Sequence, residues 1–368
     1  MLIAVRDSSG LGTKYLNLAE LYKKAEKVKF PQRTLNTMTK PRFKVDPLIA
    51  LILTAVVVAI IFPARGGFAS GFSLATKIAI AFLFFLYGAR LSPQEALQGL
   101  KHWRLHSTIL AFTFAVFPLV GLALFPLRYV LGNELYLGLL FMSLVPSTVQ
   151  SSVAFTSVAR GNVAGAIVSA STSNIVGVVL TPLLVMLLMS SDQLVISGSV
   201  FVDIAIQLLL PFVVGQLSRR WTASFAQNKL TKLVDRLSIA MVVYSAFSEG
   251  IVDGIWTRVA WWQLILLVLI SLALVELMLW FTGFAGRALG FDRADRIAIQ
   301  FCGTKKSLAT GLPMAAVIFG GASGSAGVGL LILPLMLFHQ VQLMVCAARA
   351  AKYAREDGDD VGTDAGKK

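Results

Sequence analysis

The sequence predicts an all-α polytopic membrane protein with ten transmembrane helices, arranged as two inverted five-helix repeats. Three observations support this fold class. Of the 368 residues, 56% are hydrophobic and only 14% are charged, well below the roughly one quarter that is charged in an average soluble domain. The apolar residues gather in blocks of about 20, the helix length that crosses about 30 Å of hydrocarbon. The basic residues gather on one side of these blocks.

The apolar blocks follow one another with little polar sequence between them. A chain in lipid must satisfy its backbone hydrogen bonds internally, and these Leu-, Ala- and Val-rich blocks lack the alternation of a membrane barrel, so we expect helices. The ten blocks are residues 47–64, 72–90, 107–127, 135–158, 163–190, 199–217, 234–250, 259–284, 294–318 and 325–348.

The formal charge of +14 comes from 33 Lys and Arg against 19 Asp and Glu. With both termini in the cytoplasm, ten basic residues precede the first block, twelve fall in the other cytoplasmic segments and five follow the last block, so 27 of the 33 lie inside. Cytoplasmic loops of membrane proteins carry such an excess. The charge is therefore an orientation signal, and nucleic acid is not an expected partner.

The polar ends of the chain differ from the blocks between them. Residues 1–45 form a basic arm without the apolar core of a signal peptide, so no cleaved secretion signal is expected. Met38 opens a compact basic lead into the first span and is interpreted as the biological start, with 1–37 an over-extended reading frame or a disordered arm. Residues 46–350 are predicted to hold the ten helices, as repeat 1 (about 46–190) and repeat 2 (about 199–350). Residues 351–368 are expected to be a disordered cytoplasmic tail.

Two spans at the same position in each half are interrupted. The fourth block breaks at residues 145–152 (VPSTVQSS) and the ninth at residues 301–307 (FCGTKKS). Five-span halves have opposite orientations in the membrane, as in many secondary transporters. Unwound centres in two such spans place free backbone groups near the bilayer midplane, where transporters bind ions and substrates. The alternative is that Pro146 and Gly303 merely kink their helices.

Two consecutive lysines, Lys305 and Lys306, lie in the second break. A lysine at mid-span costs several kcal/mol on insertion scales unless it faces a cavity or a partner. Neighbours on a helix point about 100° apart, so one lysine is expected to serve a ligand or an internal carboxylate while the other bonds carbonyls of the facing broken helix. Snorkelling, the alternative, needs a position near a helix end, whereas Lys305 lies about eleven residues from the nearer end of its block.

Other polar residues inside the spans complete the candidate site. Glu276, in the eighth block, is a lysine partner, a proton carrier or a paired structural acid, and these alternatives stay open. His339 and Gln340 are expected to bond between helices. The candidate substrate- and ion-binding residues are Gly303, Thr304, Lys305, Lys306, Ser307, Thr148, Gln150, Ser151, Ser152, Glu276, His339 and Gln340. No catalytic residue, metal site or cofactor is expected, because both cysteines lie in apolar runs and there are only three histidines.

At these residues the chain resembles the bile acid/sodium symporter superfamily, in its bacterial SBF-like branch. The resemblance covers roughly residues 40–352 and is carried by PSTVQSSVAFTS (146–157), ARGNV (159–163), LTPL (180–183), FCGTKKSLA (301–309) and LPLMLFHQ (333–340). It implies an inverted-repeat fold in which spans four and nine cross at their broken centres within a core domain. A panel domain of spans one, two, six and seven packs on this core. The resemblance also implies a bacterial inner membrane protein with both termini in the cytoplasm.

The chain departs from the sodium-coupled members of that superfamily. Those members carry a Ser-Asn pair in the fourth helix, a Ser and a Thr in the fifth, and a Glu followed by Gln-Asn in the ninth. The corresponding positions here are Ser151-Ser152, Ala166 and Ala170, Phe301, and Lys305-Lys306. The sodium sites are therefore expected to be lost. Our hypothesis is that a Lys305 or Lys306 ammonium takes roughly the place of a coupling cation, holds the crossing together and attracts an anionic substrate. The alternative is a polar site rebuilt one turn along by Ser169, Ser171, Thr172 and Asn174.

Together these features predict a secondary transporter of an organic anion, with proton coupling or uniport favoured over sodium coupling. Transport requires different substrate affinity in two conformations, not catalysis, so an enzyme is not expected. The alternative is a regulatory membrane protein that affects calcium homeostasis, because eukaryotic relatives in this branch are linked to it. An accessible midplane cavity at the lysines would favour transport, and tight closure would favour regulation. The expected partners are a small anionic substrate and the lipid bilayer, and a homodimer is left open.

Overall fold

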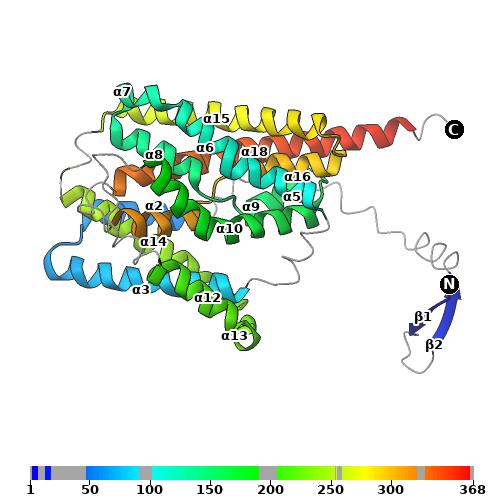
Figure 1. Ribbon diagram of the computed structural model, residues 1–368, viewed down its shortest axis with the longest axis horizontal. Coiled ribbons are helices and arrows are strands. Elements are labelled where there is room, and N and C mark those ends of the chain that lie inside the picture. The colour runs from blue at the N-terminus through cyan, green and yellow to red at the C-terminus, as the bar shows by residue number, and fades with distance from the viewer. Residues whose placement is uncertain are drawn as a thin grey trace. The chain divides into compact units, whose positions relative to one another are not determined.

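The computed structural model describes residues 2–6, 13–17, 47–90, 102–189, 205–252, 254, 259–320 and 328–364, shown as coloured ribbons in Figure 1. The chain divides into two compact units, residues 1–46 and 47–368. In the first unit, β1 (Leu2–Arg6) pairs antiparallel with β2 (Thr13–Asn17), with Leu2 opposite Asn17 and Arg6 opposite Thr13.

This hairpin covers ten residues of the arm expected over 1–37, and the other residues of that arm lie outside the described part of the chain. Both segments carry residues that favour strands, Ile3 and Val5 in β1 and Thr13 and Tyr15 in β2. The composition of the whole arm hides these two short segments, because a window wide enough to detect a span averages them with the basic residues around them.

From Pro47 onward, all regular structure in the described residues is helical, which confirms a helical membrane unit. In chain order the helices are α2 (Pro47–Ile61), α3 (Gly66–Arg90), α5 (Trp103–Ala111), the π-helical turn η2 (Phe112–Val116), α6 (Phe117–Ala123), the 3-10 turn η3 (Phe125–Leu127), α7 (Arg128–Leu131), α8 (Asn133–Leu144), α9 (Gln150–Val158), α10 (Val163–Met189), the π-helical turn η4 (Ala205–Leu209), α12 (Leu210–Leu217), α13 (Arg219–Ala226), α14 (Lys229–Val252), α15 (Trp261–Ala288), α16 (Arg293–Gly303), α17 (Leu308–Gly320) and α18 (Val328–Asp364).

The predicted apolar blocks coincide with single helices or with runs of consecutive helices. Within the described residues, five helical stretches are long and apolar enough to cross a bilayer, and two shorter apolar helices accompany them. The five are Gly66–Arg90, Trp103–Ala123, Val163–Met189, Trp261–Ala288 and Val328–Glu356. Since water-soluble proteins do not carry such a set of helices, the chain is an integral membrane protein.

Both predicted breaks are present in the structure. α8 ends at Leu144, and Val145 is extended, with φ −76° and ψ 155°. This conformation is expected for a residue that precedes a proline, here Pro146. Helix resumes at Gln150 as α9. In the second break, α16 ends at Gly303 and α17 begins at Leu308.

Beyond Pro47 the helices pack in two groups. In the first group α2 packs on α14, and α3 packs on η4, α12, α13 and α14. In the second group α15 packs on α16 and α18, α8 packs on α6, α10 and α18, and α16 packs on α9 and α10. Figure 1 shows α15 lying along α18. The two groups meet where α14 contacts α17 and α18 and where α10 contacts η4, so relative motion between them would change these contacts.

Glycines allow the closest approach inside the first group. A Cβ placed on Gly88 of α3 would overlap the backbone oxygen of Phe212 in α12, and one placed on Gly215 of α12 would overlap the backbone oxygen of Phe85 in α3. Because both obstacles are backbone atoms, neither can rotate away. Small residues facing each other in this way are typical of tightly packed membrane helices.

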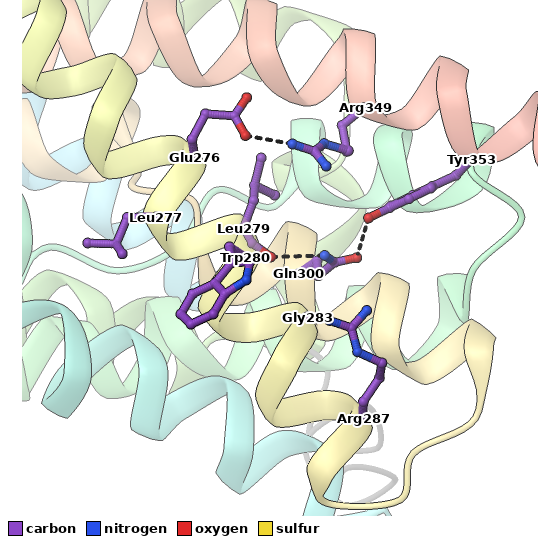
Figure 2. A pocket seen from close by; sticks show the side chains of 9 residues that line it. All are labelled: Glu276, Leu277, Leu279, Trp280, Gly283, Arg287, Gln300, Arg349 and Tyr353. Carbon is purple, nitrogen blue, oxygen red and sulfur yellow. Dashed lines mark hydrogen bonds and ion pairs between the residues drawn. The ribbon is translucent and has the colours of Figure 1, made fainter.

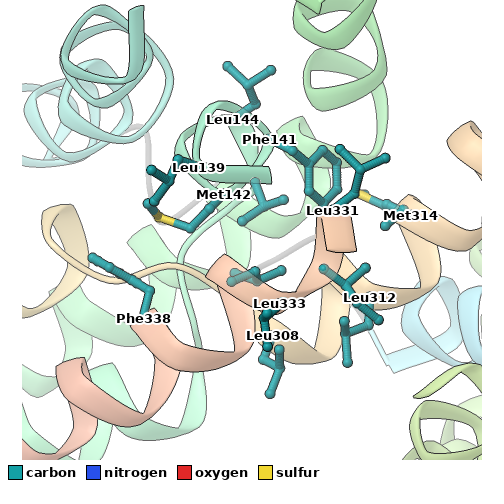
Figure 3. Close-up of a cluster of buried hydrophobic side chains, with 14 of the residues drawn as sticks. Leu139, Phe141, Met142, Leu144, Leu308, Leu312, Met314, Leu331, Leu333 and Phe338 are labelled. Atoms are coloured by element: carbon teal, nitrogen blue, oxygen red, sulfur yellow. The ribbon is translucent and has the colours of Figure 1, made fainter. Parts of the chain in front are cut away.

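An apolar cluster surrounds the two breaks in the second group. Figure 3 shows leucine, methionine and phenylalanine side chains of α8, α17 and α18 packed together. The buried members labelled there are Leu139, Phe141, Met142, Leu144, Leu308, Leu312, Met314, Leu331, Leu333 and Phe338. This packing shields the ends of the interrupted helices from lipid, so their backbone groups must be satisfied by protein.

The C-terminal end of the described chain is helical. The sequence predicts a disordered tail over 351–368; α18 continues to Asp364, and residues 365–368 lie outside the described residues. The residues around Lys352 are mostly Ala, Lys, Arg and Glu, which favour helix. Lys352 also pairs with Glu356 one turn later, at 3.8 Å, an arrangement that stabilises helices slightly.

Candidate substrate and ion site

Lys306 is fully buried in the break between α16 and α17. Its side-chain nitrogen donates to three backbone carbonyls, those of Thr113 (2.8 Å), Ser143 (2.7 Å) and Val145 (3.0 Å). It also lies 4.3 Å from the centre of the Phe117 ring. An ammonium group has three donors, so all of them are used. One of the two lysines thus bonds carbonyls of the facing broken helix, as the sequence predicts.

The three carbonyls are available for a physical reason. The last carbonyls of any helix have no intrahelical partner, and Ser143 and Val145 stand at the end of α8. Pro146, which follows, has no N–H to donate. Thr113 lies in η2, where the wider π-helical turn shifts the usual pairing. Three acceptors from two helix defects, the end of α8 and the π-helical turn η2, therefore converge on one cation.

The backbone of Lys306 is held by Gln342, which is not among the residues predicted for the site. Lys306 N–H donates to Gln342 Oε1 (2.9 Å), and Gln342 Nε2 donates to the Lys306 carbonyl (2.8 Å). Gln342 is fully buried and lies 2.8 Å from His339 Nδ1. The predicted candidate His339 therefore joins the site, whereas the partner amide is Gln342 rather than the half-buried Gln340. The sequence does contain a signal for Gln342. It is a mid-span amide three residues after His339, so the two side chains lie on the same helix face.

The first break supplies hydrogen-bond donors to the last carbonyls of α16. Ser147 Oγ donates to the carbonyl of Cys302 (2.6 Å), and Ser152 Oγ donates to the carbonyl of Phe301 (3.0 Å). These are carbonyls of the last helical turn before the second break. Each interrupted helix thus supplies the hydrogen-bond partners that the other one lacks.

Each break contains a Thr-x-x-Ser motif, Thr148/Ser151 in the first and Thr304/Ser307 in the second, at the crossing where the two breaks meet. In the first, Thr148 Oγ1 lies 2.7 Å from Ser151 Oγ. In the second, the Ser307 N–H donates to the carbonyl of Pro146 (2.7 Å), and Thr304 is fully buried, 3.4 Å from the Thr282 hydroxyl. Ser307 therefore ties the two breaks together directly.

A polar residue of α10 reaches both breaks. Asn174 Nδ2 donates to the carbonyl of Ser147 (2.8 Å), and its Oδ1 accepts from Thr310 Oγ1 of α17 (2.7 Å). Next to Asn174, Ser173 Oγ accepts from the Ser147 N–H (3.0 Å). Asn174 belongs to the alternative polar set that the sequence suggests, and in the structure it lies against the same crossing as the lysines.

Lys305 has a different environment from that of Lys306. It is also fully buried, but among the described residues its ammonium has no hydrogen-bond partner. Its nitrogen lies 3.7 Å from the centre of the Phe155 ring and 5.8 Å from that of Phe301. Phe301 stands where sodium-coupled relatives are expected to carry an acid. The charge of Lys305 therefore faces aromatic rings.

Glu276 does not pair with either lysine. It forms an ion pair with Arg349 of α18 at 2.5 Å, and the side chains of Glu276 and Arg349 remain 47% and 32% exposed. Figure 2 shows this pair on the wall of a pocket, together with Gln300 and Tyr353. Of the three roles left open for Glu276, the paired acid is the one observed, and its partner is an arginine. The sequence gives the depth of Glu276 but not the neighbour that its helix face meets, so it does not predict Arg349 as the partner.

The remaining candidates have local roles. Gly303 allows close packing, since a Cβ there would lie 3.1 Å from Thr282 and 3.2 Å from Phe112. Gln150 is exposed at the start of α9, so it does not join the hydrogen bonds of the crossing. In the described part of the chain, no group of three or more His, Cys, Asp or Glu could hold a metal ion.

The crossing is closed in this structure. Lys305, Lys306 and Thr304 have no exposed surface, and Thr148 is 7% exposed. The arrangement can hold one cation rigidly, through Lys306, and can offer a second, uncompensated cation, Lys305, to an anion. Any such anion must arrive by movement of the helices around it.

Comparison with known proteins identifies the family. Residues 46–355 match the model of the SBF-like CPA transporter family. "Putative symporter YfeH" of Escherichia coli (strain K12) is 44% identical over 84% of this chain and 93% of its own length. "Uncharacterized protein PA2026" of Pseudomonas aeruginosa is 47% identical over 88% of this chain and 97% of its own, and "Sodium/bile acid cotransporter 7" of Rattus norvegicus is 32% identical over 73% and 79%. These matches confirm the resemblance to the bile acid/sodium symporter superfamily, and the chain belongs to the SBF-like CPA transporter family.

Proposed function

We propose that this protein is a secondary transporter of an organic anion, and that the Lys305 ammonium binds the negative charge of the substrate. The main support for this proposal is the difference in hydrogen bonding between two adjacent buried lysines. Lys306 uses all three donors on backbone carbonyls, whereas Lys305 has no hydrogen-bond partner in the described chain. A buried charge that contacts only aromatic rings and has no hydrogen bond or counter-ion is costly, so a protein that retains one has a use for it. An anionic substrate is the partner that would compensate it.

Lys306 takes the role of a coupling cation in this proposal. A bound cation at crossed helix ends would be coordinated by backbone carbonyls, and the Lys306 ammonium makes these contacts as a permanent part of the chain. An acid, which a sodium site needs nearby, is replaced by Phe301. Transport would then be driven by a proton gradient or by the substrate gradient alone, rather than by sodium.

The proposed topology has ten spans in two inverted repeats, with both termini in the cytoplasm of the bacterial inner membrane. It is supported by the coincidence of the apolar blocks with helices, by matching breaks in the fourth and ninth spans, and by the segregation of the basic residues. The group of α2, α3, α12 and α14 would form the panel, and the group around the crossing would form the core.

Transport would proceed by movement of the core group against the panel group. The groups meet where α14 packs on α17 and α18 and where α10 packs on η4, and α17 begins directly after the lysine break. Because Lys305 is enclosed here, this conformation represents the state closed to both solutions. An anion with higher affinity for an open state would shift the population toward it.

The test uses the full-length protein. Anions are first screened by thermal shift, and the best stabiliser is then offered as a radiolabelled substrate to proteoliposomes under imposed proton or sodium gradients. Uptake is expected in wild type and lost in Lys305→Gln. The control is Lys77→Gln, which removes an exposed lysine from α3. Equal uptake by Lys305→Gln and Lys77→Gln would overturn the role of Lys305, and sodium-driven uptake would overturn the role of Lys306.

One observation favours the alternative of a regulatory membrane protein. The crossing is filled by its own side chains, as expected of a site that does not open for a substrate. The two functions differ in counterflow, the exchange of labelled for unlabelled substrate, which requires no driving ion. Absence of both thermal shift and counterflow across a broad anion panel, with an altered cytosolic calcium level in cells that lack the protein, would support regulation instead.

A further inference from the structure

A cavity of about 410 Å³ lies apart from the crossing, between α15, α16 and α18. Its polar lining comes from all three helices: Glu276 and Arg287 of α15, Gln300 of α16, and Arg349 and Tyr353 of α18. Figure 2 shows the arginine side chains on either side of Gln300. Nothing in the proposed transport mechanism uses this cavity.

The cavity carries a positive charge that its own residues do not balance. Two guanidinium groups face one carboxylate, because Glu276 pairs with Arg349 and the lining holds no second acid. The Glu276–Arg349 pair is partly exposed, and such pairs contribute little to stability, so a stronger acceptor can take over Arg349. Arginine binds phosphate with two parallel hydrogen bonds. The lining is therefore suited to a phosphate group.

The floor of the cavity is well ordered. Gln300 Nε2 donates to the carbonyl of Leu279 (2.9 Å), and the Tyr353 hydroxyl donates to Gln300 Oε1 (3.0 Å). This geometry requires Gly283, since a Cβ there would overlap the amide of Gln300. The site thus draws its lining from three helices, with Gln300 held in place between the charged side chains.

The cavity extends to the C-terminal end of α15, where a spanning helix would meet the lipid headgroups. Arg287 is the second-last residue of α15, a helix long and apolar enough to span the bilayer. Trp280 on the rim is 62% exposed, and exposed tryptophans are enriched at the membrane–water interface. Basic pockets between spans at this depth are known to bind anionic lipid headgroups.

An apolar track borders the cavity along α15. Leu277, Trp280 and Phe284 are exposed large apolar side chains, and their spacings of three and four residues place them on one helix face. Leu277 and Trp280 also line the cavity. The track lies within ten residues of Arg287, about 15 Å along the helix, which is within the reach of an acyl chain.

We infer that this cavity binds the phosphate of an anionic glycerophospholipid through Arg287 and Arg349, with an acyl chain lying along the α15 track. The lipid would hold α18 to α15 beside Gln300, which directly precedes Phe301 of the crossing. The inference does not depend on the substrate or on the coupling ion.

The test is lipid binding to the delipidated full-length protein in a neutral detergent. Native mass spectrometry and thermal shift compare phosphatidylglycerol with phosphatidylcholine of the same chain length. Phosphatidylglycerol is expected to bind more tightly. Arg287→Gln and Arg349→Gln should each weaken it about fivefold, the effect of one basic residue near a lipid surface. Glu276→Gln should strengthen it, because Arg349 loses its competing partner.

The matched control is Arg220→Gln, which removes an exposed arginine of α13 in the other helix group and should leave binding unchanged. Equal binding of the two lipids, or weaker binding in Glu276→Gln, would overturn the inference. Glycerol phosphate without acyl chains distinguishes a lipid from a soluble phosphate ligand. If glycerol phosphate saturates the site as well as the lipid does, the acyl track has no role and the lipid is excluded as the specific ligand.

Discussion

The side-chain nitrogen of Lys306 lies 2.7 Å from the backbone oxygen of Ser143, a residue 163 positions earlier in the chain. In return, the Ser147 hydroxyl in the first break donates to the carbonyl of Cys302, just before the second break. Two helices that are each interrupted in mid-membrane thus complete one another. In lipid, where water cannot fill the gaps, this exchange is what allows both interruptions to exist.

Lys306→Met should destabilise the protein strongly, whereas Lys305→Met should not. The first change leaves three buried carbonyls without a donor, at about 1–3 kcal/mol for each, so little folded protein or a much lower melting temperature is expected. The second replaces a buried charge that has no hydrogen bond with an apolar side chain of similar length, which is neutral or stabilising. Tryptophan fluorescence during heating in detergent measures both. Equal melting temperatures for the two variants would contradict this division of roles.

Ser147→Ala should lower stability by about 1–2 kcal/mol, because it leaves the buried carbonyl of Cys302 without its hydroxyl partner. The control is Ser157→Ala, which removes an exposed hydroxyl from the neighbouring helix α9 and should have almost no effect. Thermal unfolding under identical detergent conditions compares them. The reciprocal bonding would lose its support if Ser147→Ala melted with the control.

Sodium should not stabilise the protein beyond what choline does at the same ionic strength. The Lys306 ammonium already occupies the converging carbonyls, and Phe301 supplies no negative charge. Melting temperatures measured across millimolar sodium chloride or choline chloride are expected to coincide. Sodium-specific stabilisation that persists in Lys305→Gln would show that a sodium site has been rebuilt elsewhere, for which Asn174 and its hydroxyl neighbours are the first residues to examine.

The breaks and the lysine pair could be predicted because each is recognised from the residue type alone, at single positions inside an apolar block. A proline, a glycine or a lysine inside an apolar block is visible without knowing any neighbour, and Lys306 proved to bond the facing helix as expected. The partners were harder to assign. Gln340 and Gln342 have the same depth, but residues two apart on a helix point about 200° away from each other. Only the rotation of α18 places Gln342 at the crossing.

Glu276 illustrates the same limit. Its depth in the eighth block makes it a plausible partner for a buried lysine, and the sequence does not reveal that α15 turns this face toward Arg349 of α18. The long, low-charge blocks predict which residues enter the membrane. The pairing of helix faces depends on packing between segments far apart in the chain, and that information is distributed over many small side chains.

The contact between α3 and α12 yields a sharp test of the first helix group. Gly88→Ala would drive a methyl group into the backbone oxygen of Phe212, which cannot rotate away. Overpacking of this kind costs about 1–3 kcal/mol or more, so we expect a clearly lower melting temperature. Gly71→Ala, in the same helix, has no heavy atom within 4 Å of the new Cβ and should be neutral or stabilising by about 0.5–1 kcal/mol, since alanine favours helix over glycine. If Gly88→Ala proved as stable as Gly71→Ala, α3 and α12 would not pack as closely as described, and the first helix group would have to be held together by other contacts.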